Sequence, residues 1–402
     1  MRSVVILVSG LADTPAADLG GKTPLEAAET PALDELAAGG ILGLTRSLPE
    51  GGPPLRSMAT AAMLGVNGAA HALLPGPAAA AGMDLAVSPA AHAACLDLVA
   101  IGEQEGVGLG VVGSHLLPIE PRDAAALAAS LGEALGDLGI RVFPAVGCRH
   151  VALLEAESPL VLRCPPEDAI GRPLGEVLPE GAAGETVRLL MSRARAMLWE
   201  HPACSGMRAQ GGMSPTDVWL WGGGAPASLP TLRTRFGVRA TAVAVDPLAR
   251  GAARLMGLTV TPTLGDGALL PDLASRARQA AALAAEHELV FLHVETPEAF
   301  AHRGDAAGKA QAISRIDAEV VGPIAAALRE LDPDWRLMVA SDVVVSSTTR
   351  RHTSDPVPFV VASSRGGGRR GPGKRRFGER EAREEGIFVA EAHTLLERLL
   401  RR

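Results

Sequence analysis

Short runs of consecutive apolar residues recur along the chain, and helix-forming segments separate them. The first run, at residues 4–8, shows no alternation of apolar and polar side chains, which is typical of a strand covered on both faces. Similar apolar runs follow at residues 151–154, 240–245, 289–294 and 337–340. The segments between the runs are rich in Ala, Arg and Leu, for example 272–287 and 306–331. Strands that alternate with helices predict an α/β fold with a largely parallel sheet.

The length of the chain, 402 residues, suits one large domain with a second, smaller one. Apolar residues make up 47% of it, which predicts a globular fold. The segment 91–199 has its own rhythm of short strands around one helix at 123–138. We therefore expect this segment to form an inserted cap domain, and residues 1–90 and 200–402 to form the core.

The net charge and the cysteine pattern indicate which binding partners and which cellular compartment to expect. The net charge of −7 argues against a general nucleic-acid binder, and no apolar run is long enough to span a bilayer. The four cysteines are scattered without a CxxC pair, which favours reduced thiols in a cytoplasm over a disulfide framework; they are Cys95, Cys148, Cys164 and Cys204. We expect a cytoplasmic protein with neither a nucleic-acid nor a membrane partner.

Loops at the carboxyl ends of parallel strands carry the chemistry of most α/β proteins. In this chain the polar segments 9–13, 295–302 and 341–352 directly follow three of the predicted strands. We expect functional side chains in these three segments.

Several motifs follow one another in an order that is specific to one family. The segment 18–34 reads DLGGKTPLEAAETPALD; later come LPEG at 48–51, WLWG at 219–222 and RHTSDPVP at 351–358. In these motifs the chain resembles the cofactor-independent phosphoglycerate mutases of the archaeal and bacterial short type, which belong to the alkaline phosphatase superfamily. The resemblance runs from residue 4 to about residue 393. It implies an alkaline-phosphatase-like α/β core with an inserted smaller α/β cap domain. It also implies a glycolytic isomerase that exchanges 3- and 2-phosphoglycerate through a serine nucleophile and two divalent metals.

The resemblance implies a degenerate nucleophile-side metal site. Where the family has an Asp-Gly pair after the first strand, this chain has Ser9 and Gly10. The family's Pro-Gly-Ser-Asp stretch reads Pro-Leu-Arg-Ser here, so that Arg56 takes the nucleophile position, unless a one-residue slip restores Ser57. The family's Asp-His pair after the last core strand reads Asp-Val here, so that Asp342 survives and the imidazole is lost.

The second metal site of the family corresponds to Glu298, His302 and His352. A spacing of four places Glu298 and His302 on one face of a helix, and two histidines with one carboxylate are an established ligand set for a divalent metal. Two alternatives stay open. Either one site holds an ion such as Mn²⁺ or Zn²⁺, or no ion binds and the histidines only form hydrogen bonds.

Two further residues, Arg149 and His150, match an Arg-His pair that the resemblance implicates in substrate contact; an interdomain salt bridge is the alternative.

Arg56 has two interpretations: it binds a phosphate or carboxylate ligand, or it forms an internal ion pair with Asp342 or Asp13. The favoured hypothesis is a pseudoenzyme that binds a phosphorylated or carboxylated small molecule or a partner. The alternatives are an active mutase with a rearranged site and a one-metal phosphatase or phosphotransferase.

Overall fold

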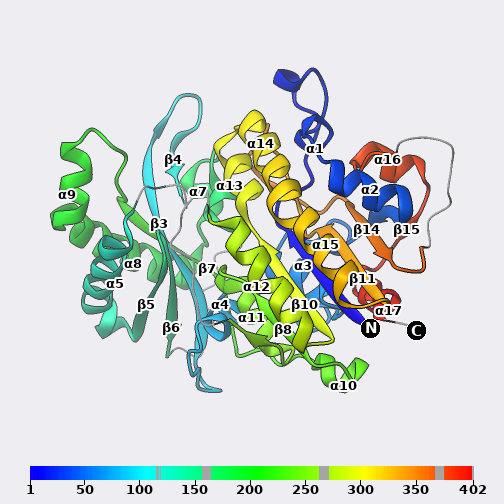
Figure 1. Ribbon diagram of the computed structural model, residues 1–402. Coiled ribbons are helices and arrows are strands. Elements are labelled where there is room, and N and C mark those ends of the chain that lie inside the picture. The colour runs from blue at the N-terminus through cyan, green and yellow to red at the C-terminus, as the bar shows by residue number, and fades with distance from the viewer. Residues whose placement is uncertain (115–116, 118, 156–163, 262–270, 367–374, 401–402) are drawn as a thin grey trace. The chain divides into compact units, whose positions relative to one another are not determined.

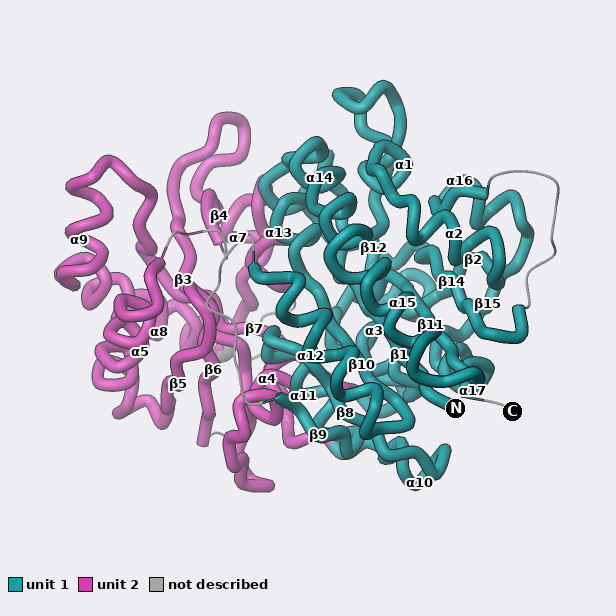
Figure 2. The backbone as a smooth tube through the Cα atoms, viewed as in Figure 1, with its two compact units in different colours: residues 1–72, 228–263, 269–402 teal, residues 73–227, 264–268 magenta. Residues whose placement is uncertain are grey.

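The computed structural model describes residues 1–114, 117, 119–155, 164–261, 271–366 and 375–400, and it divides the chain into two compact units (Figure 1). Unit 1 comprises Met1–Ala72, Ser228–Thr263 and Leu269–Arg402. Unit 2 comprises Leu73–Ala227 and Leu264–Ala268 (Figure 2).

Unit 1 is built on an eight-stranded mixed sheet, as the strand pattern predicts for an α/β fold. Its strand order is β15 (Phe388–Val389), β2 (Ile41–Thr45), β14 (Val357–Ser363), β11 (Trp335–Ser341), β1 (Arg2–Val8), β10 (Leu289–Val294), β8 (Ala240–Val243) and β9 (Thr259–Val260). The strands from β11 to β9 run parallel, and β14 runs antiparallel to both of its neighbours. The central strand β1 pairs Val4 with Val290 of β10 and with Leu337 of β11.

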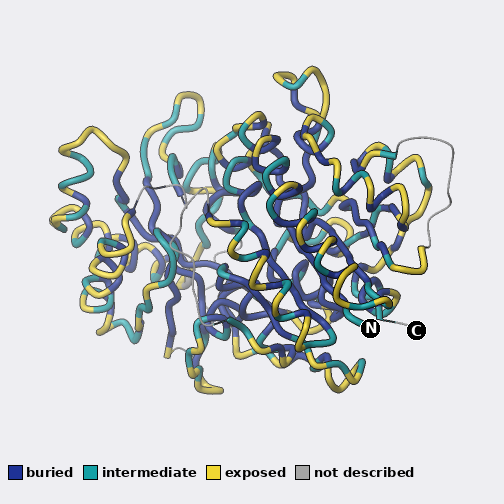
Figure 3. Tube along the Cα trace, viewed as in Figure 1, coloured by how far each residue is buried: buried dark blue, intermediate teal, exposed yellow. Residues whose placement is uncertain are grey.

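The three central strands β1, β10 and β11 are buried along nearly their whole length (Figure 3). Helices α12 (Leu273–Glu286) and α15 (Gly322–Leu331) contribute Ala and Leu side chains to the same apolar core. The segment 306–331, expected as one helix, consists of α14 (Ala306–Ile316), a π-helical stretch (Asp317–Val321) and α15.

The π-helical stretch carries the side chain that caps another helix. It contains Asp317, whose carboxylate accepts hydrogen bonds from the backbone N–H groups of Ala32 and Leu33 at 3.0 and 2.8 Å. These groups belong to the first turn of α2 (Pro31–Gly39), whose own N-cap residue forms no side-chain capping bond. The carboxylate of Asp317 therefore caps α2 from a distant part of the sequence.

Unit 2 contains an antiparallel sheet instead of a parallel one. Its strand order is β4 (Gly108–Gly113), β3 (His92–Gln104), β6 (Arg149–Leu154) and β5 (Ile140–Val146), and β7 (Asp217–Gly224) also pairs with β3. Helices α5 (Pro121–Leu135) and α8 (Gly181–Glu200) pack against each other and against strands of this sheet. The apolar run 151–154 thus belongs to an antiparallel strand.

The bounds of unit 2 are wider than the expected cap segment 91–199. The reason is packing: α4 (Pro75–Gly82) lies against β3, and β7 pairs with the same strand. The function of unit 2 as a cap stays a prediction. Within the described residues, no helix combines the length and apolarity that crossing a membrane requires.

Candidate active site

Three loops that follow parallel strands meet at one edge of the sheet in unit 1. Ser9 follows β1, Asp342 follows β11, and Glu298 lies on α13 (Thr296–Arg303) after β10. The hydroxyl of Ser9 donates to Asp342 Oδ2 at 2.6 Å, and His293 Nε2 lies 2.9 Å from the same hydroxyl oxygen. The segments expected to carry functional side chains therefore come together.

The turn after β1 requires glycine. Gly10 has a φ of +68°, and a Cβ at this position would lie 2.8 Å from the Cα atom of Glu298. Only a residue without a side chain fits a left-handed backbone at so close an approach. The absence of a Cβ at Gly10 is what allows Glu298 to lie next to Ser9.

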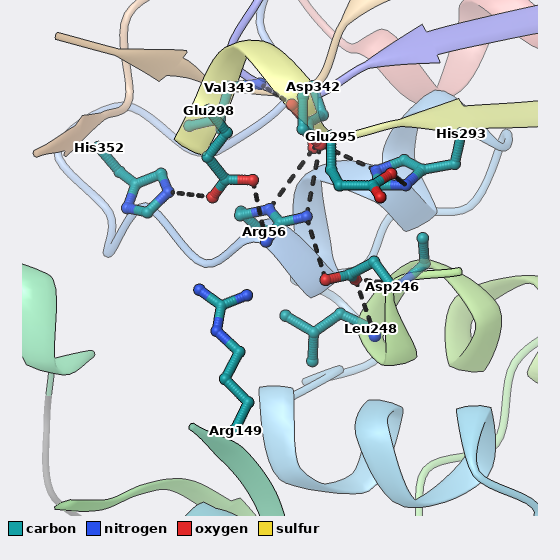
Figure 4. A network of polar contacts seen from close by, with 12 residues as sticks. Arg56, Arg149, Asp246, Leu248, His293, Glu295, Glu298, Asp342, Val343 and His352 are labelled. Atoms are coloured by element: carbon teal, nitrogen blue, oxygen red, sulfur yellow. Dashed lines mark hydrogen bonds and ion pairs between the residues drawn. The ribbon is translucent and has the colours of Figure 1, made fainter. Parts of the chain in front are cut away.

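Arg56, the first residue of α3 (Arg56–Met63), lies at the centre of this group (Figure 4). Its Nη1 atom is 3.1 Å from Glu298 Oε2, and its Nη2 atom is 3.6 Å from Asp246 Oδ2. The Nε atom lies 3.9 Å from Asp342 Oδ2, and Nη2 also donates to Ser9 Oγ at 3.4 Å. With 6% of its surface exposed, Arg56 is a buried cation among three carboxylates.

Asp246 is a further member of this group that the sequence motifs did not predict. This residue precedes α11 (Pro247–Leu255), and its Oδ1 atom accepts hydrogen bonds from the N–H groups of Leu248 and Ala249 at 2.9 and 3.0 Å. Its position directly after the apolar run 240–245 could have indicated a functional residue, since the strand formed by that run pairs in parallel with β10 and ends at the same side of the sheet. An Asp-Pro pair is also an ordinary start of a helix, so the signal was ambiguous.

Electrostatics around Glu298 favour its ionised form. Burial opposes ionisation, yet the Arg56 guanidinium and the neighbouring imidazoles of His302 and His352 outweigh it and hold the pKa of Glu298 well below its usual range. Burial lowers the pKa of His293, which favours the neutral imidazole beside Ser9. The group formed by Arg56, Asp246, Glu298 and Asp342, here called the centre, thus combines ionised carboxylate with a permanent guanidinium charge.

The second predicted ligand set also converges. Glu298 Oε1 lies 3.0 Å from His352 Nε2 and 3.5 Å from His302 Nε2. His302 Nδ1 is 2.9 Å from the carbonyl oxygen of Arg350, an acceptor, so this nitrogen carries the proton and Nε2 faces Glu298. Two imidazole nitrogens and a carboxylate oxygen arranged in this way fit one divalent metal ion.

The nucleophile-side residues do not fit a metal ion. Val343 packs in an apolar cluster with Leu48, Ala59 and Val345 and offers no ligand atom. The Ser9 hydroxyl is engaged with Asp342, and the guanidinium of Arg56 lies within 4 Å of both. A divalent ion bound here would be repelled by that guanidinium at short range. The other nucleophile candidate, Ser57, is fully buried on α3.

The remaining predicted residues belong to unit 2, on strand β6. Arg149 pairs with Asp97 across the sheet, and its Nη2 atom lies 3.8 Å from Glu167 Oε1; 25% of its side chain is exposed. His150 is 1% exposed, and burial lowers its pKa to about 4. Because successive residues of a strand face opposite sides of the sheet, the structure does not bring Arg149 and His150 together.

Comparison with known proteins points to one family. The family model described as the metalloenzyme superfamily matches residues 1–400. A probable 2,3-bisphosphoglycerate-independent phosphoglycerate mutase from Geobacter sulfurreducens is 31% identical, with 100% of both chains covered. A 2,3-bisphosphoglycerate-independent phosphoglycerate mutase from Methanothrix thermoacetophila is also 31% identical, over 90% of this chain and 91% of that protein.

Two solved structures share the fold. The PH0037 protein from Pyrococcus horikoshii superposes with a TM-score of 0.74 at 22% identity, covering 99% of this chain and 96% of that one. A cofactor-independent phosphoglycerate mutase from Thermoplasma acidophilum superposes with a TM-score of 0.55 at 20% identity, covering 99% and 98%.

Proposed function

Because this chain belongs to the metalloenzyme superfamily and, within it, to the 2,3-bisphosphoglycerate-independent phosphoglycerate mutases, we propose that it has kept their fold without their two-metal serine chemistry. In this proposal it binds a phosphorylated or carboxylated small molecule and does not turn it over. One observation carries the proposal: Arg56, which the resemblance aligns with the nucleophile, is a buried guanidinium within 4 Å of Glu298, Asp246 and Asp342.

A guanidinium fails in both roles that the family's mechanism requires at this position. It stays protonated at every physiological pH, so Arg56 offers no lone pair to attack phosphorus. Its charge also opposes the binding of a divalent cation among the same carboxylates. Ser57 and Ser9 are both 0% exposed, and the Ser9 hydroxyl donates a hydrogen bond to Asp342, so neither hydroxyl is presented to a substrate.

The ion pairs of Arg56 favour an internal structural role over ligand binding. Three carboxylates lie within 4 Å of its guanidinium nitrogens and compete with an anionic ligand. Asp13, the other partner considered for Arg56, instead forms an ion pair with Lys309 at 2.7 Å. The cation that we propose for the anionic ligand is therefore Arg149 of unit 2, whose side chain is 25% exposed.

The catalytic part of the proposal is tested by a coupled assay of 3- to 2-phosphoglycerate conversion with added Mn²⁺, using an active family member as the positive control. We expect no turnover above the buffer blank. Mass spectrometry after incubation with 3-phosphoglycerate should find neither Ser57 nor Ser9 phosphorylated. Turnover, or phosphoserine at either position, would contradict the proposal and support a mutase with a rearranged site.

The ligand-binding part is tested by calorimetry with 3-phosphoglycerate in the presence of a chelator. Arg149→Ala should weaken binding by about 10- to 100-fold, since a charge-assisted hydrogen bond contributes about 1.5–3 kcal/mol. Arg141→Ala is the matched control, because Arg141 is an exposed arginine on the neighbouring strand β5. Equal losses in both variants, or no binding by the wild type, would remove Arg149 from the proposal.

A second candidate function is favoured by the convergence of Glu298, His302 and His352. A divalent ion held by these residues would supply a Lewis acid for a phosphoryl oxygen, as in a one-metal phosphatase or phosphotransferase. This function predicts hydrolysis of p-nitrophenyl phosphate with Mn²⁺ or Zn²⁺, and loss of hydrolysis in His352→Ala. If the wild type shows no hydrolysis above background, the second candidate is excluded.

A further inference from the structure

We infer that Arg56 is a fixed internal cation that takes the place of a divalent metal ion, so that its centre is complete without metal and becomes a metal site when the guanidinium is removed. The inference deepens the proposed function and rests on it, because both place a protein cation where the family's chemistry requires a metal.

The charge of the centre requires a cation. The three carboxylates that face Arg56 are almost fully shielded from water: Asp342 is 0%, Glu298 4% and Asp246 8% exposed. Buried carboxylates are strongly destabilising unless a cation and hydrogen bonds compensate them. Each of these three carboxylates forms its ion pair with a different nitrogen of the guanidinium.

The arrangement of the oxygen atoms also suits a metal ion. One carboxylate oxygen from each of Asp246, Glu298 and Asp342 and the Ser9 hydroxyl surround the guanidinium at 3.1–3.9 Å. Carboxylate and hydroxyl oxygens are the ligands that Mg²⁺ and Mn²⁺ prefer. Removing the Arg56 side chain would leave these oxygens around a space lined by three carboxylates, without the guanidinium that pairs with all of them.

A nearby arginine is committed to another carboxylate. Arg276 Nη1 lies 3.2 Å from Glu295 Oε1, and it also contacts Glu295 Oε2 at 3.3 Å. Arg276 therefore serves as an internal comparison, since its ion pairs within the described part of the chain involve a single carboxylate, that of Glu295. Its removal leaves one carboxylate, which is too few to hold a divalent ion without further ligands.

The test compares Mn²⁺ uptake by equilibrium dialysis in the wild type and in Arg56→Ala. We expect the variant to bind one Mn²⁺ more than the wild type, with an affinity for that ion about 100-fold or more above any uptake by the wild type at this centre. Arg56→Lys, which keeps a cation, and Arg276→Ala should gain no ion. Adding Asp342→Asn to Arg56→Ala should abolish the gain.

The inference is overturned if Arg56→Ala is folded by circular dichroism and binds no additional Mn²⁺. Should the variant fail to fold in chelator, refolding on addition of Mn²⁺ supports the inference. The second variant, Arg56→Ala/Asp246→Asn, removes one carboxylate together with the cation. If Mn²⁺ restores folding in neither variant, the inference is overturned. Mutase turnover by the wild type would overturn the proposed function itself, whereas an inactive wild type whose Arg56→Ala variant binds no extra ion overturns only this inference.

Discussion

Buried carboxylates in this protein differ in how well a cation compensates them. Glu298 lies 3.1 Å from a guanidinium nitrogen, and its pKa is held low in spite of burial. Asp97 in unit 2 is equally buried, and burial raises its pKa to about 7, although Arg149 and a hydrogen bond from Trp221 at 3.0 Å act in the opposite direction. Two buried carboxyl groups thus have pKa values shifted in opposite directions.

The raised pKa of Asp97 predicts a pH dependence of stability. The folded state keeps the proton up to about pH 7, whereas the unfolded state loses it near 3.8, so this contribution is complete below pH 3.8 and is lost as the pH rises toward 7. Asp97→Asn keeps an acceptor for Trp221 without the charge. We expect it to be more stable than the wild type by roughly 1–3 kcal/mol at pH 8, with the difference shrinking toward pH 4.

Urea unfolding at pH 5 and pH 8 measures this difference in the free energy of unfolding. Asp217→Asn is a useful comparison, since burial raises the pKa of Asp217 to about 6 and the same trend should be smaller there. A destabilised Asp97→Asn at pH 8 would show that Asp97 is ionised and paired in the folded protein.

At the scale of elements, helix α11 is tied to the centre through its N-cap. Asp246 Oδ1 caps the helix, and Oδ2 of the same residue faces Arg56 at 3.6 Å. Helix α12 has a comparable cap, in which exposed Asp272 accepts a hydrogen bond from Ser275 N at 2.8 Å and faces no buried arginine among the ion pairs described. These two helices separate the contribution of a cap from that of the ion pair.

We expect Asp272→Ala to lower the free energy of unfolding by about 1 kcal/mol, the ordinary cost of losing an N-cap. Asp246→Ala should cost about 3 kcal/mol or more, because it also removes a partner from a buried guanidinium. Chemical denaturation of both variants against the wild type provides the comparison. If the two losses are equal, the contact between Asp246 and Arg56 contributes nothing to stability.

The same scale shows which elements the sequence could predict. The runs 4–8, 289–294 and 337–340 became the three central parallel strands, because uninterrupted apolar runs suit strands covered on both faces. The run 151–154 has the same pattern but lies in an antiparallel sheet, since periodicity reports burial and not strand direction. The ion-pair partners of Arg56 could not be predicted in this way, because they follow from the order of the strands in the sheet, and no local sequence pattern encodes that order.

At the scale of the whole molecule, the centre around Arg56 lies within unit 1, and each of its carboxylates comes from a different segment of the chain. Asp246, Glu298 and Asp342 follow three different strands of one sheet, and Arg56 enters from helix α3. Resemblance to the family located Glu298, Asp342 and Arg56 in the sequence, but only the folded chain shows that the guanidinium faces all three carboxylates. The fold of the family is retained, and we propose that an arginine provides the positive charge that metal ions provide in the family.

The metal content of the purified protein tests this substitution most directly. After loading with Mn²⁺ and exhaustive dialysis, we predict fewer than two ions per chain by inductively coupled plasma mass spectrometry. Any ion present should be held by Glu298, His302 and His352, so His302→Ala/His352→Ala should hold none. Two ions in the wild type, or an ion retained by the double variant, would place metal beside Arg56 and contradict the substitution.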